Sequence, residues 1–179
     1  MKAANQFGQC RECGAELVDW KRVHKHNLSD ATYTFEALKI ELFRHYMWHV
    51  EISQKAVNHA RRKGKIGTRT AAKKQIYKSV GSAEPRYIDG LQTPREDSDR
   101  ATAINYAQHA TACCCRTCIE YWHNIPIGRE LTEEEIGYFT DLVMLYIEER
   151  LPYLTENGEQ VPPIRKKTCK RSSTENEGG

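Results

Sequence analysis

Four of the seven cysteines and two of the seven histidines of this chain fall within fifteen residues, at positions 109–123. Thiolates and imidazoles are the ligands that zinc prefers in proteins. The cluster contains a C-x-x-C unit at 115–118, and a second C-x-x-C unit lies at 10–13. Two such units in one chain are a stronger zinc signal than either unit alone. The sequence therefore predicts a bound Zn²⁺.

A tetrahedral zinc needs four nitrogen or sulfur ligands, and each C-x-x-C turn can bring two thiolates to one ion. Gly14 permits the N-terminal turn, and the central unit can occupy the first turn of a helix. A knuckle, a hairpin and a helix start are together typical of a treble-clef-like site. The predicted ligands of this structural zinc are Cys10, Cys13, Cys115 and Cys118.

A second division of the ligands remains open. In it, the N-terminal cysteines bind a metal with His24 and His26, and the central cluster forms a site of its own. Two histidines one helical turn apart, such as His45 and His49, can also reach one ion, although we favour a packing role for His45. The alternative ligands of the central site are Cys114, His49, His109 and His123.

The sequence does not decide whether the chain is an enzyme. It contains no H-E-x-x-H motif, no deaminase motif and no phosphate-binding glycine loop. In an enzyme, His109 or His123 would transfer protons beside a metal with an open coordination position, because imidazole titrates near neutral pH. A third interpretation is a thiol redox protein that uses Cys115 and Cys118 at a helix N-terminus. The flanking cysteines count against it.

Charge is unevenly distributed along the chain, although the net charge is only +3. Residues 52–83 contain no acidic residue, whereas residues 130–149 are rich in glutamate. This pattern favours DNA or RNA as a partner, with an ordinary solvated helix surface as the alternative. A protein partner for the two charged faces, with a purely structural zinc, is a further interpretation. The predicted nucleic-acid-binding residues are Arg61, Arg62, Lys63, Lys65, Arg69, Lys73 and Lys74.

Helical periodicity dominates the chain, so we expect a mainly α-helical, compact domain with a small N-terminal zinc knuckle and hairpin. The hairpin would include residues 16–23. Ser53 and Thr132 are the expected N-caps of two helices, and Glu135 completes a capping box. Helices are predicted over residues 35–49, 53–64, 70–80, 101–110 and 115–122, and from 132 to before Pro152.

A chain of 179 residues that is 39% apolar can bury one substantial core, so we expect a single domain over residues 1–155. Residues 156–179 are polar and basic, and we predict that they form a disordered tail. The longest apolar stretch, residues 142–147, is too short to cross a membrane, and the N-terminus has no apolar signal segment. Thiols kept reduced for a metal suit the cytoplasm.

The segment Gln92-Thr93-Pro94, together with the run from Gln-His-Ala-Thr-Ala-Cys-Cys-Cys-Arg-Thr-Cys to Gly-Arg-Glu-Leu-Thr at 108–132, resembles an uncharacterised bacterial family, domain of unknown function 4186. The resemblance covers about residues 90–150 and suggests a bacterial or phage protein. It implies that other members replace Cys113 and that some lack the N-terminal cysteines, which favours a self-contained central site. It implies no particular activity. The positions implied as shared are His109, Cys114, Cys115, Arg116, Cys118, Trp122, His123, Gly128 and Arg129.

Overall fold

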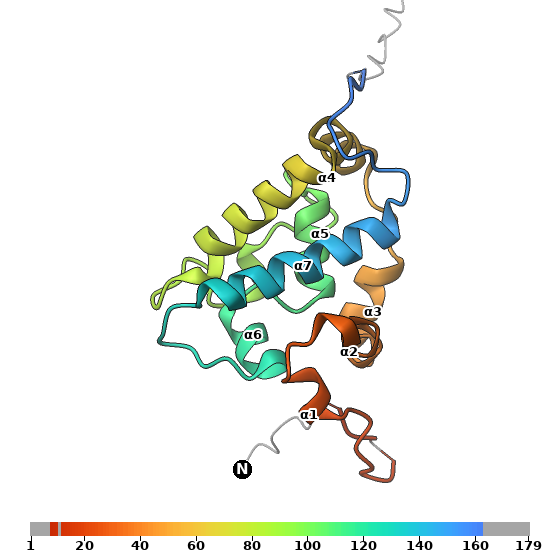
Figure 1. Cartoon of the computed structure of the whole chain (residues 1–179). Coiled ribbons are helices and arrows are strands. Elements are labelled where there is room, and N and C mark those ends of the chain that lie inside the picture. The colour runs from red at the N-terminus through yellow and green to blue at the C-terminus, as the bar shows by residue number, and fades with distance from the viewer. Residues whose placement is uncertain (1–7, 11, 163–179) are drawn as a thin grey trace, which may run out of the picture.

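A computed structural model describes residues 8–10 and 12–162 of the protein, and its architecture is mainly helical, as predicted (Figure 1). The short 3₁₀ segments are η1 (Leu28–Asp30) and η3 (Gly90–Gln92), and a π-helical turn, η2, covers Tyr77–Gly81. None of the helices in the described residues is both long enough and apolar enough to span a membrane. The α-helices are α1 (Trp20–Val23), α2 (Ala31–Leu38), α3 (Leu42–His49), α4 (Gln54–Ile76), α5 (Ala103–Ala110), α6 (Arg116–His123) and α7 (Glu133–Arg150).

The long helix α7 organises the core, because it packs along both α4 and α5, and α3 packs against α5 in turn. Its N-terminus has the predicted capping box: Thr132 accepts a hydrogen bond from the Glu135 backbone, and the Glu135 carboxylate accepts one from the Thr132 backbone. Nine of its eighteen side chains are buried, and the helix ends at Arg150, before Pro152. The loop between α5 and α6, which carries the central cysteines, is attached to this core.

The predicted hairpin over residues 16–23 is wrong. The described part of the chain contains only an isolated antiparallel bridge, between Gln9 and Glu16, and Trp20–Val23 is helical. The physical reason is local, because the Asp19 side chain accepts a hydrogen bond from the Arg22 backbone and so caps the first turn of α1. Val23, which alternation had assigned to a strand, is instead buried from the helix.

The predicted helix over 35–49 is two helices. Residues 39–41 form a turn after α2, and Glu41 has an extended backbone (φ −75°, ψ 121°) before α3 begins. The Glu41 carboxylate accepts a hydrogen bond from the indole of Trp122 at 3.0 Å, which ties the turn to α6. The helical periodicity of the sequence does not predict this long-range contact between Glu41 and Trp122.

The helices predicted over 53–64 and 70–80 occur as the two parts of α4, which a non-helical Gly64 separates, and the second part begins before residue 70. Ser53 is the N-cap of α4, as predicted, and the kink is at Gly64, which has φ +64°. A Cβ at Gly64 would lie 2.3 Å from the backbone carbon of Asn157, so only glycine fits there. Beyond the kink, the N–H groups of Lys65 and Ile66 donate to the carbonyls of residues 155 and 156. The start of the predicted tail is thereby attached to α4, whereas its residues 163–179 lie outside the described residues.

Candidate metal centre

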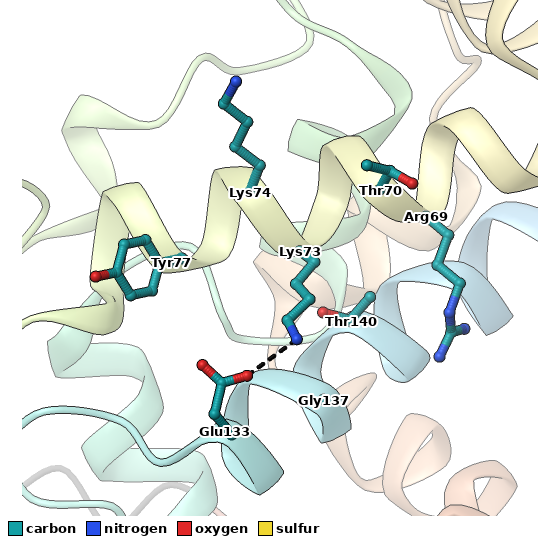
Figure 2. Close-up of a pocket in the computed structure, with 8 residues that line it drawn as sticks. All are labelled: Arg69, Thr70, Lys73, Lys74, Tyr77, Glu133, Gly137 and Thr140. Carbon is teal, nitrogen blue, oxygen red and sulfur yellow. Dashed lines mark hydrogen bonds and ion pairs between the residues drawn. The ribbon is translucent and has the colours of Figure 1, made fainter.

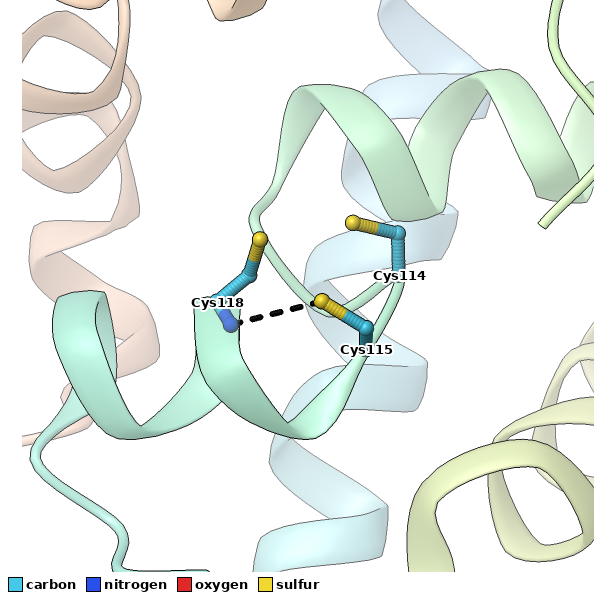
Figure 3. Close-up of side chains that lie close together, drawn as sticks. All are labelled: Cys114, Cys115 and Cys118. Atoms are coloured by element: carbon cyan, nitrogen blue, oxygen red, sulfur yellow. Dashed lines mark hydrogen bonds between the residues drawn. The ribbon is translucent and has the colours of Figure 1, made fainter. Parts of the chain in front are cut away.

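The sulfur atoms of Cys114, Cys115 and Cys118 all lie within 4.8 Å of one another. Figure 3 shows them pointing into a common space from the loop between α5 and α6 and from the first turn of α6. Cys115 is the N-cap of α6, and its sulfur accepts a hydrogen bond from the Cys118 backbone at 3.4 Å. The loop reverses its direction through Ala112, which has φ +56°. This turn brings the Cys114 thiol close to the thiols of Cys115 and Cys118, the predicted C-x-x-C pair.

The three thiols are suited to a single soft metal ion. Zinc bonds to sulfur are about 2.3 Å long, so tetrahedral ligation places the sulfurs roughly 3.8 Å apart. Sulfurs already within 4.8 Å of one another reach that spacing through small side-chain movements. Thiolate donors select Zn²⁺, Cu⁺ or iron–sulfur chemistry over Mg²⁺ and Ca²⁺. The cluster could therefore hold a metal, and its donor atoms restrict the metal to the thiophilic ones.

A buried arginine lies against the cluster. Arg44 of α3 is 3% exposed, and its guanidinium donates to the Cys118 sulfur at 3.0 Å and to the His109 carbonyl at 2.5 Å. Burial opposes the charge of Arg44, but the nearby sulfurs of Cys114 and Cys118 and the Glu41 carboxylate at 3.2 Å outweigh burial and raise its pKa. A buried cation requires neighbouring anions, and the Glu41 carboxylate and the cysteine sulfurs are the groups that surround Arg44.

Among the three thiols, Cys118 is the one whose thiolate form is most favoured. Hydrogen bonds from the thiols of Cys114 and Cys115 lower the pKa of Cys118 to about 2, and Arg44 acts in the same direction. Hydrogen bonds from the Cys114 thiol to Cys115 and Cys118 raise the pKa of Cys114. Since metal ions bind thiolates, Cys118 is the cysteine of the cluster best prepared to bind one.

His109 lies beside the cluster with one ring nitrogen free. Its side chain is 1% exposed, its Nε2 is 3.3 Å from the Thr93 carbonyl, and its buried Nδ1 has no hydrogen-bond partner. Burial lowers its pKa to about 4, so the ring is neutral at pH 7. Since Nε2 carries the proton that is donated to the carbonyl, Nδ1 retains its lone pair. His109 lies outside the group of ligand atoms within 4.8 Å of one another, and its neutral ring can accept a proton or a hydrogen bond at the cleft wall.

A cleft of about 240 Å³ opens beside the cluster. Its wall combines two of the cysteines, the buried arginine and histidine, and aromatic and aliphatic side chains from α3 and from the segment that precedes α5. The cleft makes one side of the cluster accessible to a small ligand. Its lining residues are Glu41, Phe43, Arg44, Gly90, Leu91, Arg95, His109, Cys114 and Cys118.

The N-terminal C-x-x-C unit lies apart from this cluster. Cys10 and Cys13 do not belong to the group of sulfurs within 4.8 Å, so the structure does not bring together the predicted treble-clef ligand set. The physical reason is the packing of α1: Trp20 contacts Tyr121 and Trp122, near the last turn of α6. The central cysteines lie at the opposite end of that helix.

The N-terminal unit nevertheless folds as a tight turn. The backbone N–H of Gly14 donates to the Cys10 carbonyl at 2.8 Å, and Gly14 has φ +73°, as the sequence suggested. Backbone N–H groups of Cys13 and Glu12 lower the pKa of Cys10. The turn thus presents two nearby thiols, one half-buried and one exposed. Among the described residues, no third possible metal ligand lies close to both of them.

None of the predicted histidines, His109 included, belongs to the three-sulfur group. His45 and His49 stack on each other on the exposed face of α3, with ring centroids 4.3 Å apart. His123 is fully buried, its Nε2 is 3.0 Å from the Thr111 carbonyl, and its own carbonyl is 2.8 Å from Nε2 of His26. His24 lies beside Trp20 of α1. His123 therefore lies in the core and not in the cleft wall.

Four of the seven predicted nucleic-acid-binding residues on α4 form ion pairs with acidic residues. Lys73 lies 2.9 Å from Glu133 across the groove between α4 and α7, and Lys74 also lines this groove, with its side chain pointing away from Glu133 (Figure 2). Helix α7 and the segment that follows it thus supply the acids that residues 52–83 lack. This pairing does not support the predicted nucleic-acid surface. The other ion pairs are Arg61–Glu159, Lys65–Glu148, Lys65–Glu156 and Arg69–Asp141.

Sequence reasoning missed Arg44 and Gly90, which both line the cleft. Arg44 had a detectable signal, because it precedes the apolar Met47 and Trp48 by three and four residues and so occupies the buried stripe of α3. A charged residue in such a stripe indicates a buried partner. Gly90 had no signal of this kind, since it lies in a polar segment.

These features define a class of protein: a mainly helical domain with a buried three-cysteine cluster that could bind a metal. The chain belongs to the family described as Domain of unknown function (DUF4186), whose model matches residues 32–148. The match includes the three clustered cysteines, Arg44 and His109, and it excludes Cys10 and Cys13. It confirms the predicted family and extends well before residue 90. No solved structure matches the chain.

Proposed function

We propose that this protein binds one soft transition-metal ion, preferentially Zn²⁺, through the thiolates of Cys114, Cys115 and Cys118. The observation that carries the proposal is the buried guanidinium of Arg44, 3.0 Å from the Cys118 sulfur. Three thiolates and one Zn²⁺ have a net charge of −1, and Glu41 adds a second negative charge 3.2 Å from Arg44, so Arg44 compensates part of the negative charge of the site. A buried ionic site requires such compensating charge.

The fourth coordination position would face the cleft. Zinc sites with three protein ligands and an open position usually have a functional role, whereas four protein ligands are typical of structural sites. Cys114 and Cys118 belong to the cleft wall, so a ligand that enters the cleft can approach the ion. This arrangement favours a metal that binds an exogenous ligand, with a closed structural zinc in an interaction module as the second candidate.

His109 is the residue whose role separates these two candidates. Its unpartnered Nδ1 supports a function next to the metal, because a ligating histidine normally donates its other N–H to a carbonyl or carboxylate, as Nε2 does toward Thr93. If Nδ1 binds the ion, the site is closed and structural. If it binds the exogenous ligand, it could accept a proton during hydrolysis.

Reduced thiols are a condition of the proposal. The six described cysteines form no disulfide, and a metal site of three thiolates suits the cytoplasm, where thiols stay reduced. Redox chemistry at Cys115 and Cys118 would instead require these sulfurs to be free of metal. Nucleic-acid binding remains a prediction from the charge pattern, and it would depend on cations without an ion pair among the described residues, such as Arg62, Lys63 and Lys74.

Metal analysis of protein purified without added metal tests the proposal. We expect about one zinc per chain in the wild type and in Cys10→Ser/Cys13→Ser, and none in Cys115→Ser/Cys118→Ser. The two double variants are matched, because each removes one C-x-x-C pair by the same exchange. Wild-type protein without metal would contradict the proposal. Loss of the metal from the N-terminal variant would instead restore the treble-clef ligand set.

A further inference from the structure

We infer that the cleft admits a small oxyanion, of the phosphate or carboxylate type, to the fourth position of the metal, with Gly90 leaving the space and Arg95 supplying positive charge. This inference rests on the proposed function and names the ligand class of the same site. It depends on the position of Gly90 beside the sulfurs of Cys114 and Cys115 and on the charges of the cleft wall.

Gly90 leaves open a space directly beside the ligand sulfurs. A Cβ at this position would lie 3.5 Å from the Cys114 sulfur and 4.0 Å from the Cys115 sulfur. In a tetrahedral zinc site, with bonds of about 2.0 Å to oxygen and 2.3 Å to sulfur, the fourth oxygen lies roughly 3.5 Å from each sulfur. A side chain at residue 90 would therefore extend close to the place of an exogenous oxygen ligand.

Backbone conformation does not explain the glycine. The described glycines with positive φ are Gly8, Gly14, Gly64 and Gly128, and Gly90 is not among them. A residue with a side chain could adopt the backbone of Gly90 without the strain of the left-handed region. The space next to the sulfurs is thus the property that glycine provides here.

The segment that carries Gly90 is fixed against the cysteine loop on both sides. Before it, the Ile88 carbonyl accepts a hydrogen bond from the Thr117 backbone at 3.1 Å and from the Thr117 hydroxyl at 2.7 Å. After it, the Thr93 hydroxyl donates to the Cys114 carbonyl at 2.7 Å. The gap beside the sulfurs is therefore held by the fold.

The charges of the cleft wall favour an anion. The guanidinium of Arg95 lies 4.8 Å from the centre of the Phe43 ring, and both side chains line the cleft. The carboxylate of Glu96 is 3.6 Å from Nε of Arg95, so its charge is only partly compensated at that distance. The acidic residue of the wall, Glu41, is bound by Arg44 and by Trp122. Arg95 is thus the cation available to a ligand.

Cobalt substitution tests this inference, because Co²⁺ in a thiolate site has visible absorption that changes with the fourth ligand. The Co²⁺-loaded full chain is titrated with inorganic phosphate and, separately, with acetate at constant ionic strength. We expect a saturable spectral change in the wild type and a dissociation constant about tenfold higher in Arg95→Met, as for the loss of one charged hydrogen bond. Arg95→Lys should recover part of the affinity. Phosphate and acetate distinguish the two types of oxyanion.

Gly90→Ala is the decisive variant. Its methyl group makes ordinary van der Waals contacts with the sulfurs, so the variant should fold, bind one Co²⁺ per chain and show no spectral response to either anion. Unchanged anion binding in this variant would overturn the role of Gly90. A wild type that binds Co²⁺ but responds to neither anion would overturn the inference and leave the metal proposal intact. A wild type that binds no Co²⁺ would contradict both.

Discussion

The two C-x-x-C units of this chain share a spacing but differ in their surroundings. The N-terminal unit is a turn at the surface with two thiols, and no third possible ligand lies close to both of them among the described residues. The central unit starts a helix, is joined by Cys114 and lies against the buried Arg44. Spacing alone brings two sulfurs together, whereas a third ligand, burial and a compensating charge make a site that could retain an ion. Four changes test this comparison.

The largest effect is expected from the third thiol, which the N-terminal unit lacks. Cys114→Ser should reduce zinc affinity by at least a hundredfold, because serine is a poor zinc ligand. With free zinc at a thousand times the wild-type dissociation constant, a hundredfold loss of affinity removes roughly 2.7 kcal/mol of stability, and complete loss of the metal removes roughly 4 kcal/mol. For a chain of this size, that lowers Tm by about 8–12 °C. Zinc titration with a chelator and thermal unfolding by circular dichroism measure the two effects.

Cys113→Ala is the matched control for this change. Cys113 is an equally buried neighbour, but its sulfur lies 3.3 Å from the Thr111 hydroxyl and does not belong to the cluster. The control should retain one zinc per chain and lose only packing energy, about 1 kcal/mol. Equal zinc loss in the two variants would mean that Cys114 is no ligand and would remove the main difference between the two units.

The second effect concerns the compensating charge. Arg44→Met removes the guanidinium that donates to Cys118 and should lower zinc affinity by roughly 10–100-fold, as is usual for groups that hydrogen-bond to metal ligands. Arg44→Lys preserves the charge and should recover part of the loss. Competition with a zinc indicator gives both affinities. Wild-type affinity in Arg44→Met would show that the compensating charge does not hold the ion.

The third effect concerns the buried His123, at the C-terminal end of the helix that the central C-x-x-C unit starts. Burial lowers the pKa of His123 to about 3, below the value of about 6.5 in an unfolded chain. Between these values the unfolded state binds a proton that the folded state does not, so stability falls as the pH decreases. We expect the loss to be roughly 1.4 kcal/mol per pH unit from this residue.

Urea unfolding of chelator-treated protein at pH 7 and pH 5 measures this dependence. In His123→Gln the slope should be smaller, because glutamine does not titrate, while its amide can still donate to the Thr111 carbonyl. The wild type and the variant are compared at each pH, so the contribution of His109 cancels. An identical pH dependence in the two proteins would mean that the pKa of His123 is the same in the folded and unfolded states.

The sequence predicted the parts of this fold that depend on neighbouring residues. The Ser53 cap and the Thr132–Glu135 capping box are local patterns, and both occur as expected. The proximity of Cys115 and Cys118 follows from their position at a helix start, for the same reason. Local hydrogen bonds of this kind are set by spacing along the chain, which a single sequence contains.

The sequence could not predict contacts between distant residues. The kink at Gly64 depends on residues 156 and 157, and the pairing of the basic face depends on α7. The burial of Arg44 depends on the cysteines of a loop seventy residues later. In each case the energy arises from long-range packing or charge, for which the sequence offers several partners. The distance of Cys10 and Cys13 from the central cysteines has the same kind of cause, because Trp20 packs against Trp122 near the other end of α6.

The smallest effect is expected from the N-terminal unit itself, and it completes the comparison. Cys10→Ser/Cys13→Ser alters one half-buried and one exposed side chain, so stability should change by no more than about 0.5 kcal/mol. Urea unfolding in the presence of zinc measures this change, and metal analysis should find the central ion unaffected. A stability loss of several kcal/mol, or a second zinc that disappears with these cysteines, would mean that the exposed turn also binds metal. The two C-x-x-C units would then differ in their sets of ligands and not in whether they bind a metal.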